Sequence, residues 1–336
     1  MNMRNIYILW GLLACIAFTS CYEEDTLTPT EGGVELRFKV PQGNNSWDDD
    51  IAQIYENYNV YLIYKDLQRA DFNRSWTGTS YGSGYEGQGC VNDEMANYYV
   101  EFMKKHIFAY LNPPITSKVL PMYWYLGYNV YSKSVLEIGG VILASWIVPI
   151  HENYDGLDYW CTCMFGEDNP SDPYLIPTDR ALLDRRRKMI LAPVLEKAVK
   201  AGNIIIPEEF EVGFDHVTNL IAGLGREDDP NYYLTRGYPG SVNTYVFNSI
   251  SEPANNSYPP TNEETFIGYM HLSMYYNQAR LAEVYPADKY PFLTEKFAFV
   301  QKYLKDKYQI DLEAIANGPE DWNLPLPPIP ETPDEE

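Results

Sequence analysis

The sequence predicts an α+β protein, with a mixed sheet and helices in its N-terminal part and a mostly helical C-terminal half. Segments that read as strands, because they are alternating or continuously apolar, occur before residue 150. After residue 178, apolar residues at helical spacing dominate. Residues 34–317 contain no internal repeat and no linker-like change of composition, so we expect them to form a single domain.

The N-terminal part alternates between predicted strands and helices. The predicted strands cover residues 34–40, 59–64, 122–131 and 139–148. The last of these is a continuous apolar run, which is typical of a buried strand. Helices are predicted over residues 46–58 and 92–111, because apolar residues recur there at helical spacing after a capping Ser46 or Asn92.

A long helix organises the C-terminal half. Thr178 or Asp179 can cap its start, and Gly202-Asn203 can end it. Pro193 lies inside this helix, where proline removes a hydrogen bond at a cost of about 3 kcal/mol, so we expect a kink. Further helices are predicted over residues 207–220, 261–283 and 290–308.

The two ends of the chain read as segments outside the domain. Residues 1–20 are typical of a bacterial signal peptide, with an apolar run too short to span a bilayer. Small residues directly before Cys21 predict that this cysteine is lipidated, and residues 21–33 then form a polar tether. The acidic residues after Cys21 resemble the export tag of surface lipoproteins in some Gram-negative bacteria. We therefore expect a lipid anchor in the outer membrane and exposure at the cell surface.

The composition of the chain argues against some classes of binding partner. The chain of 336 residues has a formal net charge of −22, which argues against nucleic acid and against an anionic membrane patch as partners. Residues 318–336 are rich in proline and acid and are predicted to be a disordered tail. Of the cysteines left in the domain, Cys90 with either Cys161 or Cys163 is the only easy disulfide pair, and the sequence leaves its status open.

Several segments together carry a resemblance to one family. They are the lipoprotein signal, NVYLIYKD, GGVIL, PEEF, EETF and the closing YPFLTEKFAFVQKYLKDKYQIDLEAI. In these segments the chain resembles the family of substrate import-associated zinc metallohydrolase lipoproteins. The resemblance implies a zincin-like metallopeptidase scaffold over most of the chain. Members are expected to carry His-Glu-x-x-His on the helix before the Pro-x-x-Phe segment, with the two histidines on zinc and the glutamate activating water.

The residues at the matching positions lack this chemistry. Ala192 and Glu196 stand where the two histidines are expected, and Pro193 stands at the glutamate. Only Glu264, or its neighbour Glu263, keeps the downstream acid. No two of the four histidines lie four residues apart. We therefore expect a catalytically inactive member without zinc or another cofactor. It would serve as a binding or accessory component of a nutrient-import system, with a glycan, a peptide or import-complex proteins as partners.

An active metallohydrolase with non-standard ligands is the alternative. His216, Glu264 and one of Cys161 and Cys163 could then hold zinc. His151 with the same two cysteines forms a second group, which lacks a fourth ligand at close spacing. A paired-carboxylate glycosidase also stays open, because 47 acidic residues offer many pairs whose separation the sequence does not measure.

Overall fold

A computed structural model describes residues 36–74, 83–154, 156–166 and 176–329. Val40–Glu336 forms one compact unit, and Met1–Lys39 is a separate unit of which residues 36–39 are described. The described part of the strand predicted at residues 34–40 shows no strand. Cys21 and the predicted signal peptide lie outside the described residues. Within the described ranges, no helix has the length and apolar character needed to cross a bilayer.

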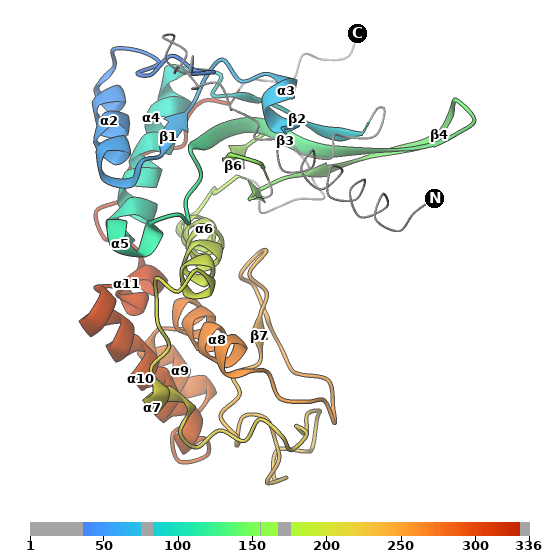
Figure 1. The fold of residues 1–336 in the computed structure, drawn as a ribbon, viewed down its shortest axis with the longest axis vertical. Helices are drawn as coiled ribbons and strands as arrows, with labels where there is room; N and C mark the ends of the chain where they lie inside the picture. The colour runs from blue at the N-terminus through green and yellow to red at the C-terminus, as the bar shows by residue number, and fades with distance from the viewer. Residues whose placement is uncertain (1–35, 75–82, 155, 167–175, 330–336) are drawn as a thin grey trace, which may run out of the picture. The chain divides into compact units, whose positions relative to one another are not determined.

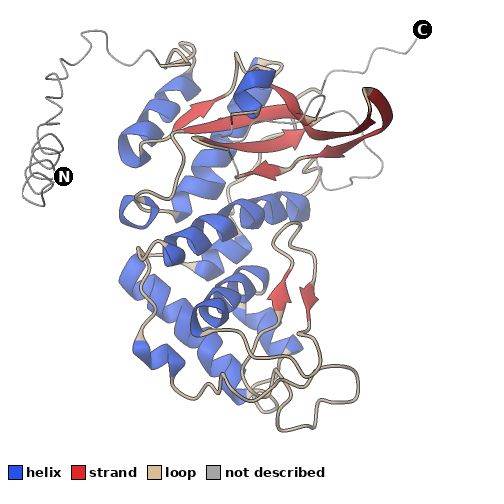
Figure 2. Ribbon diagram, turned by 45° about the vertical axis from the view of Figure 1, so that its right-hand side comes forward, coloured by secondary structure: helices blue, strands red, loops and turns tan. Residues whose placement is uncertain are grey.

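A six-stranded mixed sheet forms the centre of the N-terminal part (Figures 1 and 2). The strand order is β1-β3-β6-β5, and β2 and β4 both pair with β3. β1 and β6 run parallel to β3, whereas β2 and β4 run antiparallel to it. The strands are β1 (Tyr61–Ile63), β2 (Gly84–Gly89), β3 (Tyr123–Ile138), β4 (Val141–Pro149), β5 (Glu152–Asn153) and β6 (Tyr159–Phe165).

The two halves of the long strand β3 lie in different environments. Its first half is buried and lies between β1 and β6. Beyond Lys133 it pairs only with β4, among the strands that the structure describes. The prediction of a buried strand at residues 139–148 is wrong, because β4 is exposed over Val141–Val148. An apolar run predicts a strand, but which element covers it depends on the tertiary structure.

Helices flank the sheet in the N-terminal part. α2 packs on β1, α4 and α5. The capping box of α2 uses Asn45 and Asp48 rather than the predicted Ser46. The helix predicted over residues 92–111 is present as three consecutive forms, since an α-helix continues as a π-helix and then as a 3-10 helix. These elements are α2 (Ser46–Tyr58), α3 (Arg69–Phe72), α4 (Asp93–Phe102), η1 (Met103–Ile107), η2 (Phe108–Tyr110) and α5 (Pro113–Thr116).

The C-terminal half is helical, as predicted, with one small hairpin. α6 packs against α8 and α11, and α8 packs against α10. The helix predicted over residues 261–283 is divided, because Tyr276 is extended and Asn277 caps a new helix. The helix predicted over residues 207–220 is reduced to one turn. The elements are α6 (Arg180–Lys200), α7 (Glu208–Glu211), β7 (Ser241–Val242), β8 (Ile250–Ser251), α8 (Asn262–Tyr275), α9 (Gln278–Val284), α10 (Pro291–Tyr308) and α11 (Leu312–Asn317).

The described residues of the C-terminal tail differ from the predicted disordered segment. The Trp322 ring packs edge-on against His106 and Tyr98, with ring centroids 4.7 Å and 5.2 Å away. Asn92 donates to the carbonyl of Pro328 at 2.9 Å, and Lys105 pairs with Asp321 at 3.0 Å. One large aromatic side chain and these polar contacts therefore attach this proline-rich segment, which has no hydrophobic core of its own, to α4 and the π-helix.

Candidate functional site

One side of α6 presents Pro193 and Glu196, two of the three residues that the family resemblance places at the missing zinc motif. The helix begins at Asp179, whose side chain accepts a hydrogen bond from the Leu182 amide at 2.8 Å, as predicted. Pro193, Glu196 and Lys200 follow at spacings of three and four, so they form one stripe along the helix. Glu196 accepts a hydrogen bond from Lys200 at 2.6 Å.

The helix passes through Pro193 without a break in its assignment. A proline at position 193 cannot donate to the carbonyl of Met189, four residues earlier. The Tyr154 hydroxyl lies 3.4 Å from this carbonyl oxygen and donates to it. A side chain from the sheet region therefore partly replaces the backbone hydrogen bond that Pro193 removes.

A second stripe lies on α8 and faces the first. Thr261 caps α8, and Glu264 completes a capping box, with its Oε2 2.8 Å from the Thr261 amide nitrogen. Glu264, Gly268 and His271 occupy positions i, i+4 and i+7, which share one side of the helix. Because Gly268 has no side chain, the loop above can approach, and a Cβ there would lie 3.3 Å from Pro239 Cγ.

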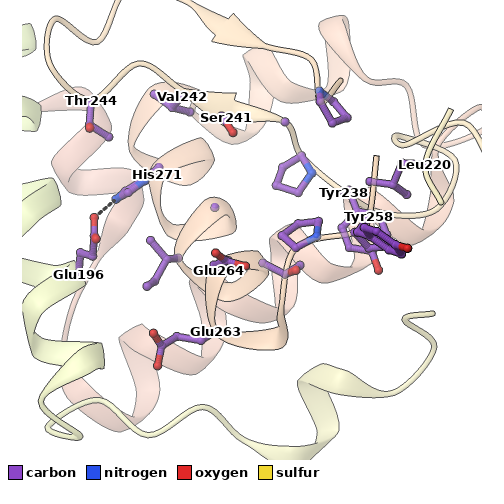
Figure 3. A pocket seen from close by; sticks show the side chains of 18 of the residues that line it. Glu196, Leu220, Tyr238, Ser241, Val242, Thr244, Tyr258, Glu263, Glu264 and His271 are labelled. Atoms are coloured by element: carbon purple, nitrogen blue, oxygen red, sulfur yellow. Dashed lines mark ion pairs between the residues drawn. The ribbon is translucent and has the colours of Figure 1, made fainter. Parts of the chain in front are cut away.

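The two stripes and the segment 238–260 enclose a cleft of about 650 Å³ (Figure 3). Its helical wall includes Glu196, Lys200, Glu263, Glu264 and His271. The loop side carries hydroxyl, aromatic and proline residues, namely Tyr238, Pro239, Ser241, Thr244, Tyr258, Pro259 and Pro260. A smaller pocket of about 220 Å³ shares Glu196 and Thr244 with this cleft and reaches Pro193, Glu152 and Tyr245.

His271 presents an unused hydrogen-bond acceptor beside a carboxylate. Its ring bonds to the backbone of Ala192, and Nε2 is buried with no hydrogen-bond partner. The bond to Ala192 therefore uses Nδ1, and a carbonyl partner makes Nδ1 the donor, so the lone pair is on Nε2. This nitrogen lies 3.9 Å from Glu196 Oε2, as the dashed line in Figure 3 marks. Burial lowers the pKa of His271 to about 4, so the ring is neutral at pH 7.

The charge of the cleft is negative. Glu196, Glu263 and Glu264 face a single lysine, Lys200, which is already paired with Glu196. Hydrogen bonds from Thr261 lower the pKa of Glu264, which stabilises its ionised form. The cleft therefore favours groups that are positively charged and that donate hydrogen bonds.

A buried ion pair supports the smaller pocket from behind. Arg186 Nη2 lies 2.8 Å from Glu152 Oε1, and the two side chains are only 1% and 7% exposed. Thr162 donates to Glu152 Oε2 at 2.6 Å, and Trp124 donates to the Thr162 hydroxyl at 2.9 Å. Burial raises the pKa of Glu152 to about 7, and Arg186 offsets this only in part. This network joins β5 and β6 to α6.

The structure brings together some of the sequence-predicted site residues and separates others. Glu196 and Glu264 line one cleft, and Pro193 lines the adjoining pocket. Ala192 is fully buried in the core and adds no side chain to either cavity.

The ligand set of the metallohydrolase alternative does not meet in the structure. Cys161 and Cys163 are buried in β6, and Cys163 Sγ accepts a hydrogen bond from the Val130 amide at 3.4 Å. His216 binds the carbonyl of Pro260 at 2.8 Å, and Glu264 is used as a helix cap. Cys90, Cys161 and Cys163 are all free thiols.

The donors in the cleft do not fit the zinc site that the family resemblance implies. A catalytic zinc site needs three protein ligands, and His271 with Glu196, 3.9 Å apart, supplies two. Among the residues that the structure describes, no group of three or more histidine, cysteine or acidic side chains could hold a metal ion.

His271 is a site residue that the sequence indicates only as a structural one. A lone histidine on a long helix reads as a structural residue when it is considered alone. Its distance of seven residues from Glu264 was the available signal, since seven residues are two helical turns and place both on one side. The opposing Glu196 comes from another helix, and the sequence alone could not place it there.

Comparison with known proteins finds little similarity. No family model matches the chain, and no curated protein matches it. Among solved structures, one similar chain is described as a "putative zinc-binding metallo-peptidase from Bacteroides caccae ATCC 43185". It has 12% sequence identity and a TM-score of 0.38, over 82% of this chain and 92% of that chain. A likeness at this level carries no activity over to the present protein.

Proposed function

We propose that this protein is a non-catalytic binding protein whose cleft between α6 and α8 holds a ligand through a protonated primary amine. We propose further that it acts at the cell surface as a lipid-anchored accessory component of a nutrient-import system in the outer membrane. The lipoprotein-like N-terminus supports the location, and the resemblance to import-associated lipoproteins supports the role.

The unpartnered Nε2 of His271 beside Glu196 carries the proposal. The two acceptor atoms lie 3.9 Å apart, so one donor nitrogen can lie at hydrogen-bond distance from both. An unsatisfied buried acceptor costs about 1–3 kcal/mol, which a ligand donor would recover. The Glu196 side chain is 32% exposed and that of His271 is 10% exposed, so an entering group meets Glu196 first.

Charge and size restrict the ligand class further. The surplus of carboxylates favours an ammonium group over a neutral hydroxyl, and a neutral imidazole accepts a hydrogen bond without repelling a cation. The volume of about 650 Å³ lies within the range of small-ligand sites, roughly 300–1,000 Å³. A peptide amino terminus and an amino sugar both supply such a group.

Calorimetric titration of the full chain tests the site. Triglycine and glucosamine are the amine probes, and N-acetyl-triglycine and N-acetylglucosamine are their neutral counterparts. We expect at least one amine probe to bind about tenfold or more tightly than its acetylated form, a difference of about 1.4 kcal/mol. Whether triglycine or glucosamine binds distinguishes a peptide ligand from an amino-sugar ligand.

Variants assign the binding to the cleft. Glu196→Gln and His271→Phe should each remove the preference for the amine. Glu283→Gln is the matched control, because Glu283 lies on α9, is 66% exposed and does not line the cleft. Equal binding of amine and acetylated probes would overturn the ligand class. One bound zinc per chain by metal analysis would overturn the non-catalytic proposal and favour the hydrolase alternative.

A further inference from the structure

The ribbon formed by the end of β3 and by β4 is apolar on both faces. Figures 1 and 2 show it extending beyond the other strands of the sheet. Trp146 and Ile147 are consecutive residues of β4, so their side chains point to opposite faces. Both are more than half exposed. A sheet that packs only one face on the protein core would instead have a polar outer face.

The exposed apolar surface is larger than a folded monomer usually shows. Six large side chains of the ribbon are between 51% and 64% exposed, namely Ile138, Val141, Ile142, Leu143, Trp146 and Ile147. Together they expose on the order of several hundred Å², which is the size at which an apolar patch marks an interaction surface.

The ribbon is also nearly free of the charge that dominates the chain. Lys133 and Glu137 are its charged residues between 132 and 149, and their charges cancel, whereas the whole chain carries −22. Two copies of such an acidic protein repel each other over most of their surfaces. Contact through the neutral ribbon keeps that repulsion small.

The outer edge of the ribbon indicates which kind of partner can bind there. Among the described strands, β4 pairs with β3 alone, so its other edge presents unpaired backbone N–H and C=O groups. A lipid bilayer cannot satisfy these groups. A second strand can, and an antiparallel pair of identical strands related by a two-fold axis satisfies both copies equally.

We infer that β4 is a self-association surface, at which two copies of this chain pair antiparallel along β4, so that the apolar side chains of the two ribbons lie side by side on both faces of the joined sheet. The resulting dimer has one continuous sheet across the two-fold axis. This inference is independent of the ligand proposed for the cleft, because the ribbon contributes no residue to it.

Sedimentation equilibrium of the full chain, in a detergent matched in density to the buffer, tests the inference. We expect a dimer at micromolar concentration. Trp146→Lys and Ile147→Lys, on opposite faces, should each raise the dimer dissociation constant by roughly 30-fold or more, as for a central interface residue. Because both side chains are exposed, the two variants should keep the far-ultraviolet circular dichroism of the wild type.

Leu224→Lys is the matched control. Leu224 is 99% exposed and lies in a loop outside the ribbon, so this variant should dimerise like the wild type. A wild type that stays monomeric up to 100 µM (roughly a hundredfold above a micromolar Kd) would overturn the inference. So would ribbon variants that dimerise as tightly as the wild type. A monomer whose binding to phosphatidylcholine vesicles is lost in Trp146→Lys would indicate a membrane surface instead, and would also overturn it.

Discussion

Replacing Pro193 by alanine should stabilise the protein. Proline in a helix interior is about 3 kcal/mol less favourable than alanine. The Tyr154 hydroxyl, at 3.4 Å from the Met189 carbonyl, recovers little of this cost. Pro193 is half-buried, so losing its ring methylenes costs on the order of 1 kcal/mol. We therefore expect Pro193→Ala to raise the free energy of unfolding by about 2 kcal/mol.

Thermal unfolding followed by circular dichroism measures this effect. A gain of about 2 kcal/mol corresponds to a Tm increase of roughly 3 °C for a domain of this size. Tyr154→Phe supplies the second side of a double-mutant cycle. Tyr154→Phe should lower the free energy of unfolding by less in the Pro193→Ala background, because there the amide of residue 193 donates to the Met189 carbonyl.

Two results would refute the reasoning. A lower Tm for Pro193→Ala would mean that the surrounding core requires the geometry that proline imposes at this turn. An equal cost of Tyr154→Phe in both backgrounds would mean that the tyrosine hydroxyl does not compensate for the missing amide.

Three further predictions concern buried groups. Burial raises the pKa of Glu152 from 4.5 to about 7, so the folded state binds this proton more tightly than the unfolded chain and stability should fall as pH rises between these values. Urea unfolding against pH should show this fall, and Glu152→Gln should remove it; an unchanged slope in the variant would contradict the assignment. Trp322→Ala should cost about 2–3 kcal/mol in urea unfolding by exposing the rings of Tyr98 and His106, whereas Leu326→Ala, at a more exposed position, should cost under about 0.5 kcal/mol. Ala192→His should destabilise the fold by about 1–3 kcal/mol, because Ala192 is fully buried; a variant that melts like the wild type would show that this site has unused room.

Local signals in the sequence predicted α6 and α10 well. Asp179 caps α6 as expected, and Gly202 follows its end with a positive φ of 76°. The apolar stripe of α10, including Leu293 and Leu304, is buried as its spacing predicted. These features depend on residues within a few turns of one another, so they can be predicted from the sequence alone.

Features that depend on distant partners could not be predicted in the same way. Val141–Val148 reads as a buried strand, because an apolar run looks the same whether or not another element covers it. Trp322 follows a helix in a proline-rich segment, and only the rings of α4 and the π-helix show that it packs. Glu196 and His271 lie on different helices, so their approach to 3.9 Å follows from the packing of α6 on α8.

The packing of Trp322 on Tyr98 and His106 affects the order in which the chain folds. These contacts, and the bond from Asn92 to Pro328, join residues more than 200 positions apart. Contacts of such long sequence separation form slowly, because the entropy of loop closure opposes them. Until the C-terminal segment docks, the rings on α4 and the π-helix have no final partner. We therefore expect the docking of the C-terminal segment to be a late step in folding.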